Sequence, residues 1–163
     1  MKQEKIVKTN ALRTLDQKKV PYNVYTYEHT DEATPGDEVA RLINKDPNTV
    51  YKTLVTRSSQ NKNNYYVFVI PVLENLDLKK AAKSINEKSI EMVHVKELLQ
   101  LTGYVRGGCS PIGMKKQFTT TFNSSIESLD KIIFSAGKIG LQVEVSPIDL
   151  KKVINYKISE IIE

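Results

Sequence analysis

Cysteine, histidine and tryptophan are nearly absent from this sequence. Its 163 residues include one cysteine, two histidines and no tryptophan. The single cysteine, Cys109, excludes an intramolecular disulfide, and so few soft ligands leave little material for a zinc site. We therefore expect a protein of a reducing compartment, the cytoplasm, that carries no metal or other cofactor.

Long apolar runs are missing as well. No segment approaches the roughly 20 apolar residues of a membrane-spanning helix, and the opening MKQEKIVKTN lacks the apolar core of a signal peptide. The hydrophobic fraction of 40% and the charged fraction of 26% are ordinary for globular domains. We expect residues 1–163 to form one soluble domain without a membrane partner.

Arginine is scarce although the chain is basic. The formal net charge is +5, and only Arg13, Arg41, Arg57 and Arg106 are arginines, so most of the positive charge is lysine. Lysine suits contact with phosphate better than bidentate reading of bases. The charge therefore favours an anionic partner such as nucleic acid, contacted through its backbone.

Hydrophobic periodicity predicts helices and strands in an order that lacks strict β–α alternation. Helices are predicted at residues 10–19, 37–45, 76–86, 94–103 and 146–155, and strands at 22–29, 49–57, 64–72, 117–125, 131–137 and 141–147. Because strands outnumber helices in the second half, we expect an α+β fold with a mixed or antiparallel sheet.

The stretch TGYVRGGCSPIG, residues 102–113, is the most glycine-rich part of the chain. Glycine allows a positive φ and a close approach of the backbone to another group. The loop could hold its N–H groups toward a ligand carbonyl or phosphate, or it could be a tight turn in which glycine serves geometry alone. It matches neither the GxxxxGK[ST] nor the GxGxxG pattern, so a nucleotide triphosphate or dinucleotide site is not indicated.

Three other features each allow two interpretations. Cys109 could be a thiol nucleophile, but no local signature links it to a histidine, and a small, partly buried cysteine is the better hypothesis. Lys52 lies among apolar residues in VYKTLV, as a desolvated pocket lysine would, although strand lysines are usually solvated. The segment FSAGKIGL, residues 134–141, could line the same pocket or form a hairpin turn.

Taken together and in order, VYKTLV, LDLKKAAKS, TGYVRGGCSPIGMKK and FSAGKIGLQVEVSPIDL resemble the YbaK/EbsC-type Cys-tRNA(Pro)/Cys-tRNA(Cys) deacylases. The resemblance covers nearly the whole chain, and that family is related to the editing domain of bacterial-type prolyl-tRNA synthetases. It implies a barrel-like mixed sheet of about six or seven strands surrounded by helices. It also implies an enzyme that edits mischarged tRNA(Pro) in trans, in a transient complex with prolyl-tRNA synthetase.

The resemblance also assigns site residues. The catalytic set it implies is Lys52, which would hold the terminal adenosine, and the backbone of Gly107 and Gly108, which would stabilise the oxyanion. The amino group of the substrate would be bound by Ser135 and Gly137. The remaining pocket residues that it implies are Tyr27, Thr53, Cys109, Ser110, Pro111 and Ala136.

One position departs from the family pattern. Gln142 stands where the resemblance leads us to expect an acidic residue, which leaves the reaction rate and the amino-acid preference open. Glu144 lies two residues further on the same face of the predicted strand and could compensate.

The reaction that the resemblance implies uses the thiol of the cysteine substrate to attack its own carbonyl carbon. Two alternatives stay open at this point: a related deacylase that directs water at Ala-tRNA(Pro), and a module that binds tRNA or the synthetase without catalysis.

Overall fold

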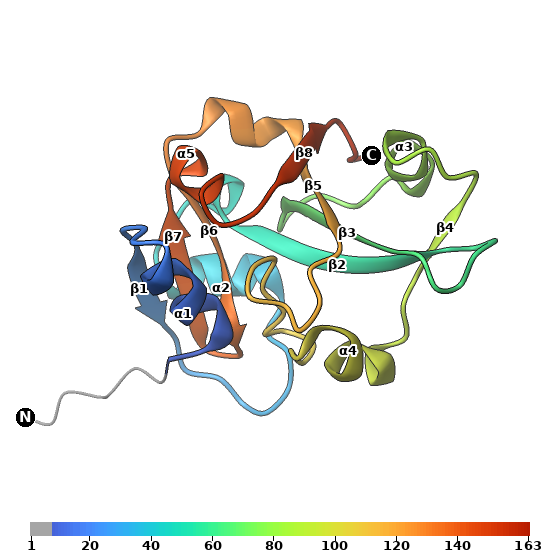
Figure 1. Cartoon of the computed structure of the whole chain (residues 1–163). Coiled ribbons are helices and arrows are strands. Elements are labelled where there is room, and N and C mark those ends of the chain that lie inside the picture. Colours follow the sequence, from blue (N-terminus) through green and yellow to red (C-terminus); the bar gives the residue numbers. More distant parts are fainter. Residues whose placement is uncertain (1–7) are drawn as a thin grey trace, which may run out of the picture.

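A computed structural model describes residues 8–163. The expectation that the opening segment is not a signal peptide concerns residues 1–7 as well, and these lie outside the described residues. The described chain forms five α-helices and eight strands (Figure 1). The helices are α1 (Asn10–Gln17), α2 (Gly36–Leu42), α3 (Leu78–Ser84), α4 (Val95–Thr102) and α5 (Pro147–Leu150). The strands are β1 (Asn23–Thr26), β2 (Tyr51–Ser58), β3 (Tyr65–Pro71), β4 (Ile90–Met92), β5 (Thr119–Asn123), β6 (Ile132–Lys138), β7 (Leu141–Val145) and β8 (Tyr156–Ser159).

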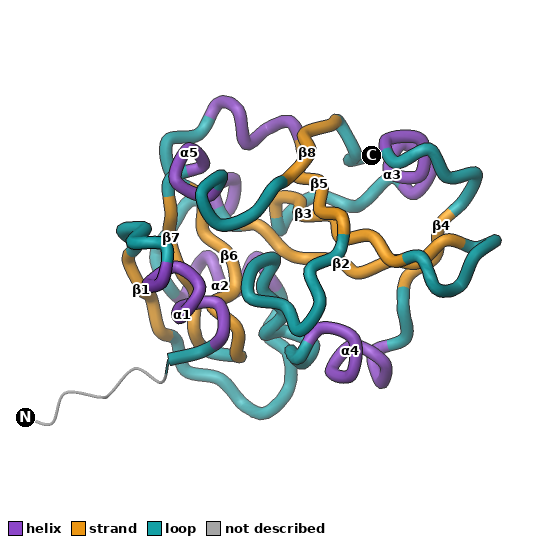
Figure 2. The backbone as a smooth tube through the Cα atoms, viewed as in Figure 1, coloured by secondary structure: helices purple, strands orange, loops and turns teal. Residues whose placement is uncertain are grey.

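The strands form two sheets that adjoin near the middle of the molecule (Figure 2). An antiparallel sheet has the order β1-β7-β6, and a mixed sheet has the order β4-β2-β3-β5-β8, in which β5 runs parallel to both its neighbours. Val50 forms a bridge with Ile133 and so links the start of β2 to β6. The predicted α+β class with a mixed sheet is confirmed, with eight strands divided between two sheets.

The two strands that sequence patterns did not predict are short. Strand β4 has three residues, and β8 has four residues, of which the central two, Lys157 and Ile158, are exposed. Each is added to the edge of the larger sheet by pairing with a longer strand, β4 with β2 and β8 with β5. Their formation depends on that tertiary partner more than on their own composition.

The helices begin and end at the residues that local chemistry favours. The Thr9 hydroxyl accepts the Leu12 N–H at 3.2 Å and caps α1. Helix α4 ends at Gly103, whose φ of +84° is the left-handed conformation of a terminating glycine. Helix α5 is shorter than predicted, because it gives way to turns after Leu150. None of the helices in residues 8–163 is long and apolar enough to cross a bilayer.

The main hydrophobic core lies between the two sheets and α1. Leu12 and Leu15 of α1 pack with Phe122 of β5 and Phe134 of β6, and all four side chains are fully buried. A second cluster lies between β3 and α3, and a third, which includes Tyr27, Val39 and Val50, lies under α2. Burial of this apolar surface is the main stabilising contribution, at about 25 cal/mol per Å².

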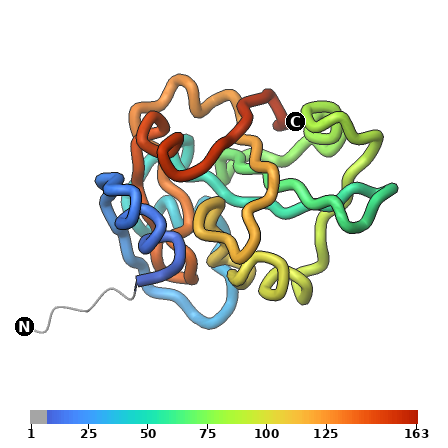
Figure 3. The backbone as a smooth tube through the Cα atoms, in the orientation of Figure 1, coloured from blue at the N-terminus to red at the C-terminus, as the bar shows by residue number. Residues whose placement is uncertain are grey.

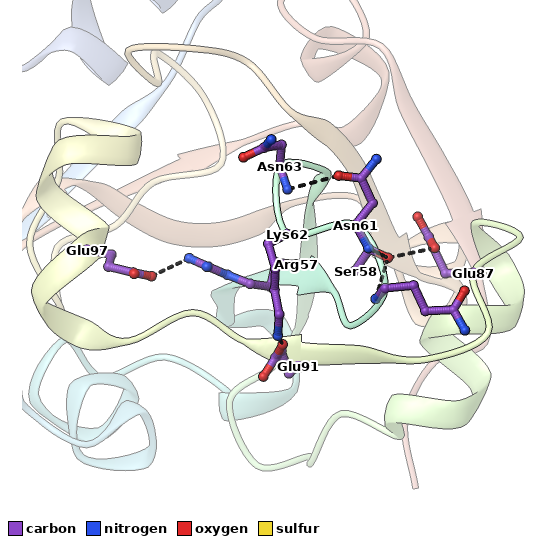
Figure 4. A network of polar contacts seen from close by, with 9 residues as sticks. Arg57, Ser58, Asn61, Lys62, Asn63, Glu87, Glu91 and Glu97 are labelled. Atoms are coloured by element: carbon purple, nitrogen blue, oxygen red, sulfur yellow. Dashed lines mark hydrogen bonds and ion pairs between the residues drawn. The ribbon is translucent and has the colours of Figure 1, made fainter.

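Ion pairs brace the hairpin of β2 and β3 against the chain that follows it (Figure 4). Arg57 of β2 pairs with Glu97 of α4, and Lys62 in the hairpin turn pairs with Glu91 of β4. The Ser58 hydroxyl donates to Glu87 at 2.9 Å. The Arg57–Glu97 pair thus holds β2 against α4, from which the glycine-rich loop departs, and the other two contacts hold the hairpin against β4 and the residues before it.

Candidate active site

A cavity of about 470 Å³ opens where the two sheets meet the glycine-rich loop. Its walls are five separate segments of the chain, and each contributes from one to five residues. These residues are Ala33, Thr34, Pro35, Gly36 and Val39 at α2, Val50, Tyr51, Lys52, Thr53 and Leu54 at the start of β2, Val72 after β3, Arg106, Gly107 and Cys109 of the loop, and Ser135 and Gln142 of β6 and β7.

The sequence prediction placed eleven residues in the site, and the cavity brings five of them together. Those five are Lys52, Thr53, Gly107, Cys109 and Ser135. Six others, Tyr27, Gly108, Ser110, Pro111, Ala136 and Gly137, do not line the cavity. The five residues lie together at the cavity, and their roles remain predictions. The other six do not contribute to its wall.

The glycines of the loop are explained first by contacts within the protein. A Cβ on Gly108 would lie 2.8 Å from Lys138 Cα, and one on Gly107 would lie 2.7 Å from the Ala33 Cβ. Gly107 also has a φ of +86°, in a turn closed by the Gly108 N–H, which donates to the Val105 carbonyl at 2.9 Å. Figure 3 shows this loop, in gold, packed between the other segments. Packing and backbone conformation alone therefore explain why glycine is needed at positions 107 and 108.

The same turn limits which N–H groups can face a ligand. We expected Gly107 or Gly108 to supply an N–H donor for the oxyanion. Because the Gly108 N–H already donates to the Val105 carbonyl, Gly107 is the candidate that remains. Within residues 8–163, neither the Gly107 nor the Cys109 N–H has a protein acceptor, and both residues line the cavity. With the Arg106 N–H, which likewise has no protein acceptor within residues 8–163, they are main-chain donors of the loop that are left for a ligand.

Two cationic side chains line the cavity, one on β2 and one in the glycine-rich loop. Lys52 is half-buried on β2, and burial lowers the pKa of its ammonium, an effect that Glu74 partly opposes. Arg106 is exposed in the loop. Among the described residues that line the cavity, none is acidic. The site therefore favours a ligand with an anionic part, such as a phosphate.

Thr53 adds a polar group without a protein partner. Its Oγ1 is buried and has no hydrogen bond within the described residues. A buried hydroxyl without a hydrogen-bond partner lowers the stability of the fold unless a ligand or a water molecule forms that hydrogen bond. Thr53 lines the cavity, whereas its Oγ1 has almost no accessible surface, so contact between this hydroxyl and a bound molecule remains a proposal.

Ser135 and Gln142 face each other across β6 and β7 and close the floor of the cavity. The two residues are register partners, and both are almost completely buried. The Ser135 Oγ accepts the Gly137 N–H at 3.2 Å. The Glu144 carboxylate accepts from Asn23 Nδ2 at 3.0 Å and from Tyr25 Oη at 3.1 Å, and Glu144 does not line the cavity. Compensation for Gln142 by Glu144 is therefore not supported.

The remaining predicted residues have structural partners. Ser110 is fully buried, and its hydroxyl accepts the Ile112 N–H at 3.5 Å. The Pro111 carbonyl accepts from Gln117 Nε2 at 3.1 Å. Ala136 lies in the main core, and a Cβ on Gly137 would meet Tyr104 at 2.9 Å. Tyr27 packs in the cluster under α2. These residues support the shape of the site from behind.

Cys109 lines the cavity as a neutral thiol. Burial raises its pKa to about 12, while a hydrogen bond with Thr102 acts in the opposite direction. The nucleophilic form of cysteine is the thiolate, which such a pKa suppresses at neutral pH. The hypothesis of a small buried cysteine is therefore favoured over that of a nucleophile. No three His, Cys, Asp or Glu side chains within residues 8–163 cluster so as to hold a metal ion.

The prediction from sequence missed the segment at residues 33–36 and Arg106. A Cβ on Gly36 would lie 2.7 Å from Val72 Cβ, so this glycine lets the start of α2 close onto the end of β3. The proline and glycine in ATPGDE predicted a turn, but the sequence did not indicate that this turn packs against Val72. Arg106 stands inside the glycine-rich stretch and could have been singled out there as its only cation.

The fold and site define a class. The sequence pattern of the aminoacyl-tRNA editing domain matches residues 29–153, and the chain belongs to this family. This membership confirms the resemblance seen in the sequence and the enzyme class that it implied, an aminoacyl-tRNA deacylase.

Individual relatives support this placement. The chain is 44% identical over 154 residues to EbsC of Enterococcus faecalis, covering 94% of this chain and 93% of that protein. EbsC is named, provisionally, as a Cys-tRNA(Pro)/Cys-tRNA(Cys) deacylase.

Solved structures share the fold at low sequence identity. A protein described, again provisionally, as a trans-editing enzyme for prolyl tRNA synthetase superposes with a TM-score of 0.80 at 17% identity, over 97% of this chain and 99% of that one. The hypothetical protein APE2540 superposes with a TM-score of 0.82 at 18% identity, over 95% and 100% of the two chains. At such identities these likenesses establish the fold alone.

Proposed function

We propose that this chain, acting as a single domain, removes cysteine wrongly attached to tRNA(Pro), and that it does so in trans. The observation that carries the cysteine assignment is the 44% identity with EbsC across nearly the full length of both proteins. The cavity adds a physical basis, because it combines cations suited to the nucleic-acid end with main-chain donors suited to an ester.

The substrate is proposed to lie across the cavity with its terminal adenosine toward Lys52. The Lys52 ammonium binds a phosphate or a ribose hydroxyl and so fixes the position of the ester. Thr53, with its unpartnered hydroxyl, contributes to the same end. Arg106 at the exposed rim contacts the phosphate backbone.

The ester carbonyl is proposed to approach the glycine-rich loop. The N–H groups of Gly107 and Cys109 donate to the carbonyl oxygen as negative charge develops on it. One such donor contributes about 3 kcal/mol to transition-state stabilisation in well-studied acyl-transfer sites. Ser135 lies at the amino-acid end and limits the space for its side chain.

The nucleophile is proposed to be the thiol of the cysteine substrate. Its sulfur forms a bond to the carbonyl carbon, the ester bond to the ribose oxygen breaks, and the thiol proton ends on that oxygen. The products are a cyclic thioester and the free 3′ end of the tRNA. This route spares prolyl and seryl esters because neither carries a thiol, whereas pocket size alone discriminates by about 10–200-fold per methylene. The neutral, buried Cys109 plays no nucleophilic part in it.

The identity of the tRNA is proposed to be supplied by prolyl-tRNA synthetase in a transient complex. A small lysine-rich domain has few means of reading an anticodon and an acceptor stem together. We place this activity in the cytoplasm, where aminoacyl-tRNA is made.

The test is deacylation of Cys-tRNA(Pro), Ala-tRNA(Pro) and Pro-tRNA(Pro) by the wild type and by Lys52→Ala. We expect selective loss of the cysteinyl ester, reduced at least about tenfold in the variant because a charge-assisted contact is removed. Preferred turnover of the alanyl ester would assign the related water-using reaction. Binding of tRNA without turnover of any ester would contradict the proposal and leave a binding module.

A further inference from the structure

The charged lining of the cavity is of one sign. Lys52 and Arg106 are the ionised side chains on its wall, and none of the described lining residues is an aspartate or glutamate. An aminoacyl ester, however, carries an α-amino group that is cationic when protonated. A cation held in this cavity would meet like charge without a lining carboxylate to offset it.

Gln142 is an uncharged polar side chain on the wall of this cavity. It is 5% exposed on β7, between Ser135 of β6 and Tyr25 of β1, and its side-chain amide makes no hydrogen bond within the described residues. The neighbouring Ser135 Oγ already accepts the Gly137 N–H. Gln142 thus presents an uncharged amide with a free donor and a free acceptor.

Ionised groups on the elements around the cavity are engaged or lie outside its wall. On β7, Glu144 is held by Asn23 and Tyr25, and on α2, Glu38 pairs with Arg41. On β2, Arg57 pairs with Glu97. The others on these elements or next to them are Asp31 and Glu32 before α2, Asp37 of α2, Lys45 after α2, which lies over the Tyr25 ring, Glu74 after β3, which acts on Lys52, and Lys138 at the end of β6. None of these residues lines the cavity.

We propose that Gln142 recognises the amino group of the substrate and that the cavity accepts this group in its uncharged form. The inference rests on the proposed editing function, which places an aminoacyl ester in the cavity. A neutral amine both donates and accepts hydrogen bonds, so the two ends of the Gln142 amide match it. An ammonium offers donors only and is repelled by Lys52.

The test uses two acceptor-stem RNA hairpins with an amide in place of the ester. One carries an alanyl group and the other a propionyl group, which is the same acyl group without the amine. Neither has a thiol, so thiol ionisation does not contribute. The quantity measured is the ratio of the dissociation constants, alanyl over propionyl, at pH 9 and pH 6. In this ratio the titration of Lys52 and of the RNA contacts cancels.

We expect the ratio to rise by about 100-fold from pH 9 to pH 6, because an α-amino group with a pKa of about 8 is protonated in that interval. A rise of less than tenfold would overturn the proposal. Failure of both hairpins to bind at pH 9 would also overturn it, because the acyl end would then not lie in the cavity.

Variants assign the effect to Gln142. In Gln142→Glu the carboxylate pairs with the ammonium, and the rise should shrink below tenfold. Gln100→Glu, which adds the same charge at an exposed position of α4, should keep the full rise. If Gln142→Glu fails to fold, Gln142→Met gives the answer, since it should weaken the alanyl hairpin about tenfold at pH 9 and leave the propionyl hairpin unchanged. Equal weakening of both hairpins would exclude recognition by Gln142.

Deacylation of Cys-tRNA(Pro) at pH 8 separates this inference from the function on which it rests. If the enzyme deacylates Cys-tRNA(Pro) but the ratio of dissociation constants is the same at pH 9 and pH 6, the inference about the amino group is wrong and the editing function stands. A pH-dependent ratio without deacylation of any ester supports the inference and contradicts the editing reaction.

Discussion

Gly108 packs directly against the backbone of Lys138, and a Cβ at Gly108 would lie 2.8 Å from the Lys138 Cα. The contact seats the glycine-rich loop on the turn between β6 and β7, the two strands that supply Ser135 and Gln142. The loop and the floor of the cavity are therefore positioned as one unit.

Gly108→Ala should disturb that unit. The new methyl group meets backbone atoms that cannot rotate away, so we expect a loss of about 1–3 kcal/mol in the free energy of unfolding. Displacement of the loop should lower kcat/KM for Cys-tRNA(Pro) by about tenfold or more. Denaturant titration and deacylation assays measure the two effects.

The matched control is Gly103→Ala. Gly103 has a φ of +84° but room for a Cβ, whose nearest neighbour would be the Lys115 Cβ at 3.7 Å. This variant should lose only about 1 kcal/mol, from backbone strain, and keep its activity. If Gly108→Ala were as stable and as active as the wild type, the contact between Gly108 and Lys138 would have no role in positioning the loop.

Cys109→Ser should keep kcat within about threefold of the wild type, because removal of a true nucleophile typically costs several orders of magnitude. The thiol also predicts a dependence of stability on pH. Its folded pKa is raised to about 12 from 9.0, so the unfolded state ionises first as the pH rises. The stabilising effect is complete below pH 9 and is lost progressively toward pH 12.

The measurement that isolates this thiol is the difference in unfolding free energy between the wild type and Cys109→Ser. This difference should shift against the wild type by about 1.4 kcal/mol between pH 8 and pH 10. A constant difference over that interval would show that the thiol is not buried in the way described.

Local signals in the sequence were enough for most of the fold. The apolar spacing of Leu12 and Leu15 and the cap at Thr9 defined α1, and Gly103 marked the end of α4. The parallel pairing of β5 and the short edge strands were not predictable in this way. They depend on partners distant in the chain, which no local pattern encodes.

For the site, the sequence prediction and the cavity share five of eleven residues, and the roles of those five stay predictions. Lys52 was noticed because its neighbours are apolar, and Ser135 through the resemblance. Gly108 and Gly137 show the limit, since glycine at a ligand and glycine at a packed backbone give the same sequence pattern. The contacts with Lys138 and Tyr104 distinguish the two cases only in three dimensions.

Thr53→Val should separate stability from activity. The Oγ1 of Thr53 is buried without a partner, so its replacement by a methyl group should leave the free energy of unfolding unchanged or raise it by about 1 kcal/mol. If the hydroxyl binds substrate, kcat/KM should nevertheless fall about tenfold.

Thr121 of β5 supplies the matched control. Its Oγ1 is also buried without a partner in the described residues, but it does not line the cavity. Thr121→Val should show the same effect on stability and no loss of activity. Equal activity in both variants would exclude Thr53 from substrate binding.

Arg106→Gln should weaken the binding of tRNA through phosphate contact alone. Arg106 is exposed at the rim of the cavity and makes no ion pair within residues 8–163. Removal of one phosphate contact reduces the slope of log K against log salt concentration by about 1 and weakens all tRNA sequences alike. Lys79→Gln, which removes an exposed positive charge from α3, should leave both affinity and slope unchanged. If instead the two variants shift the slope equally, the cation at the rim has no special role, and binding is spread over the basic surface.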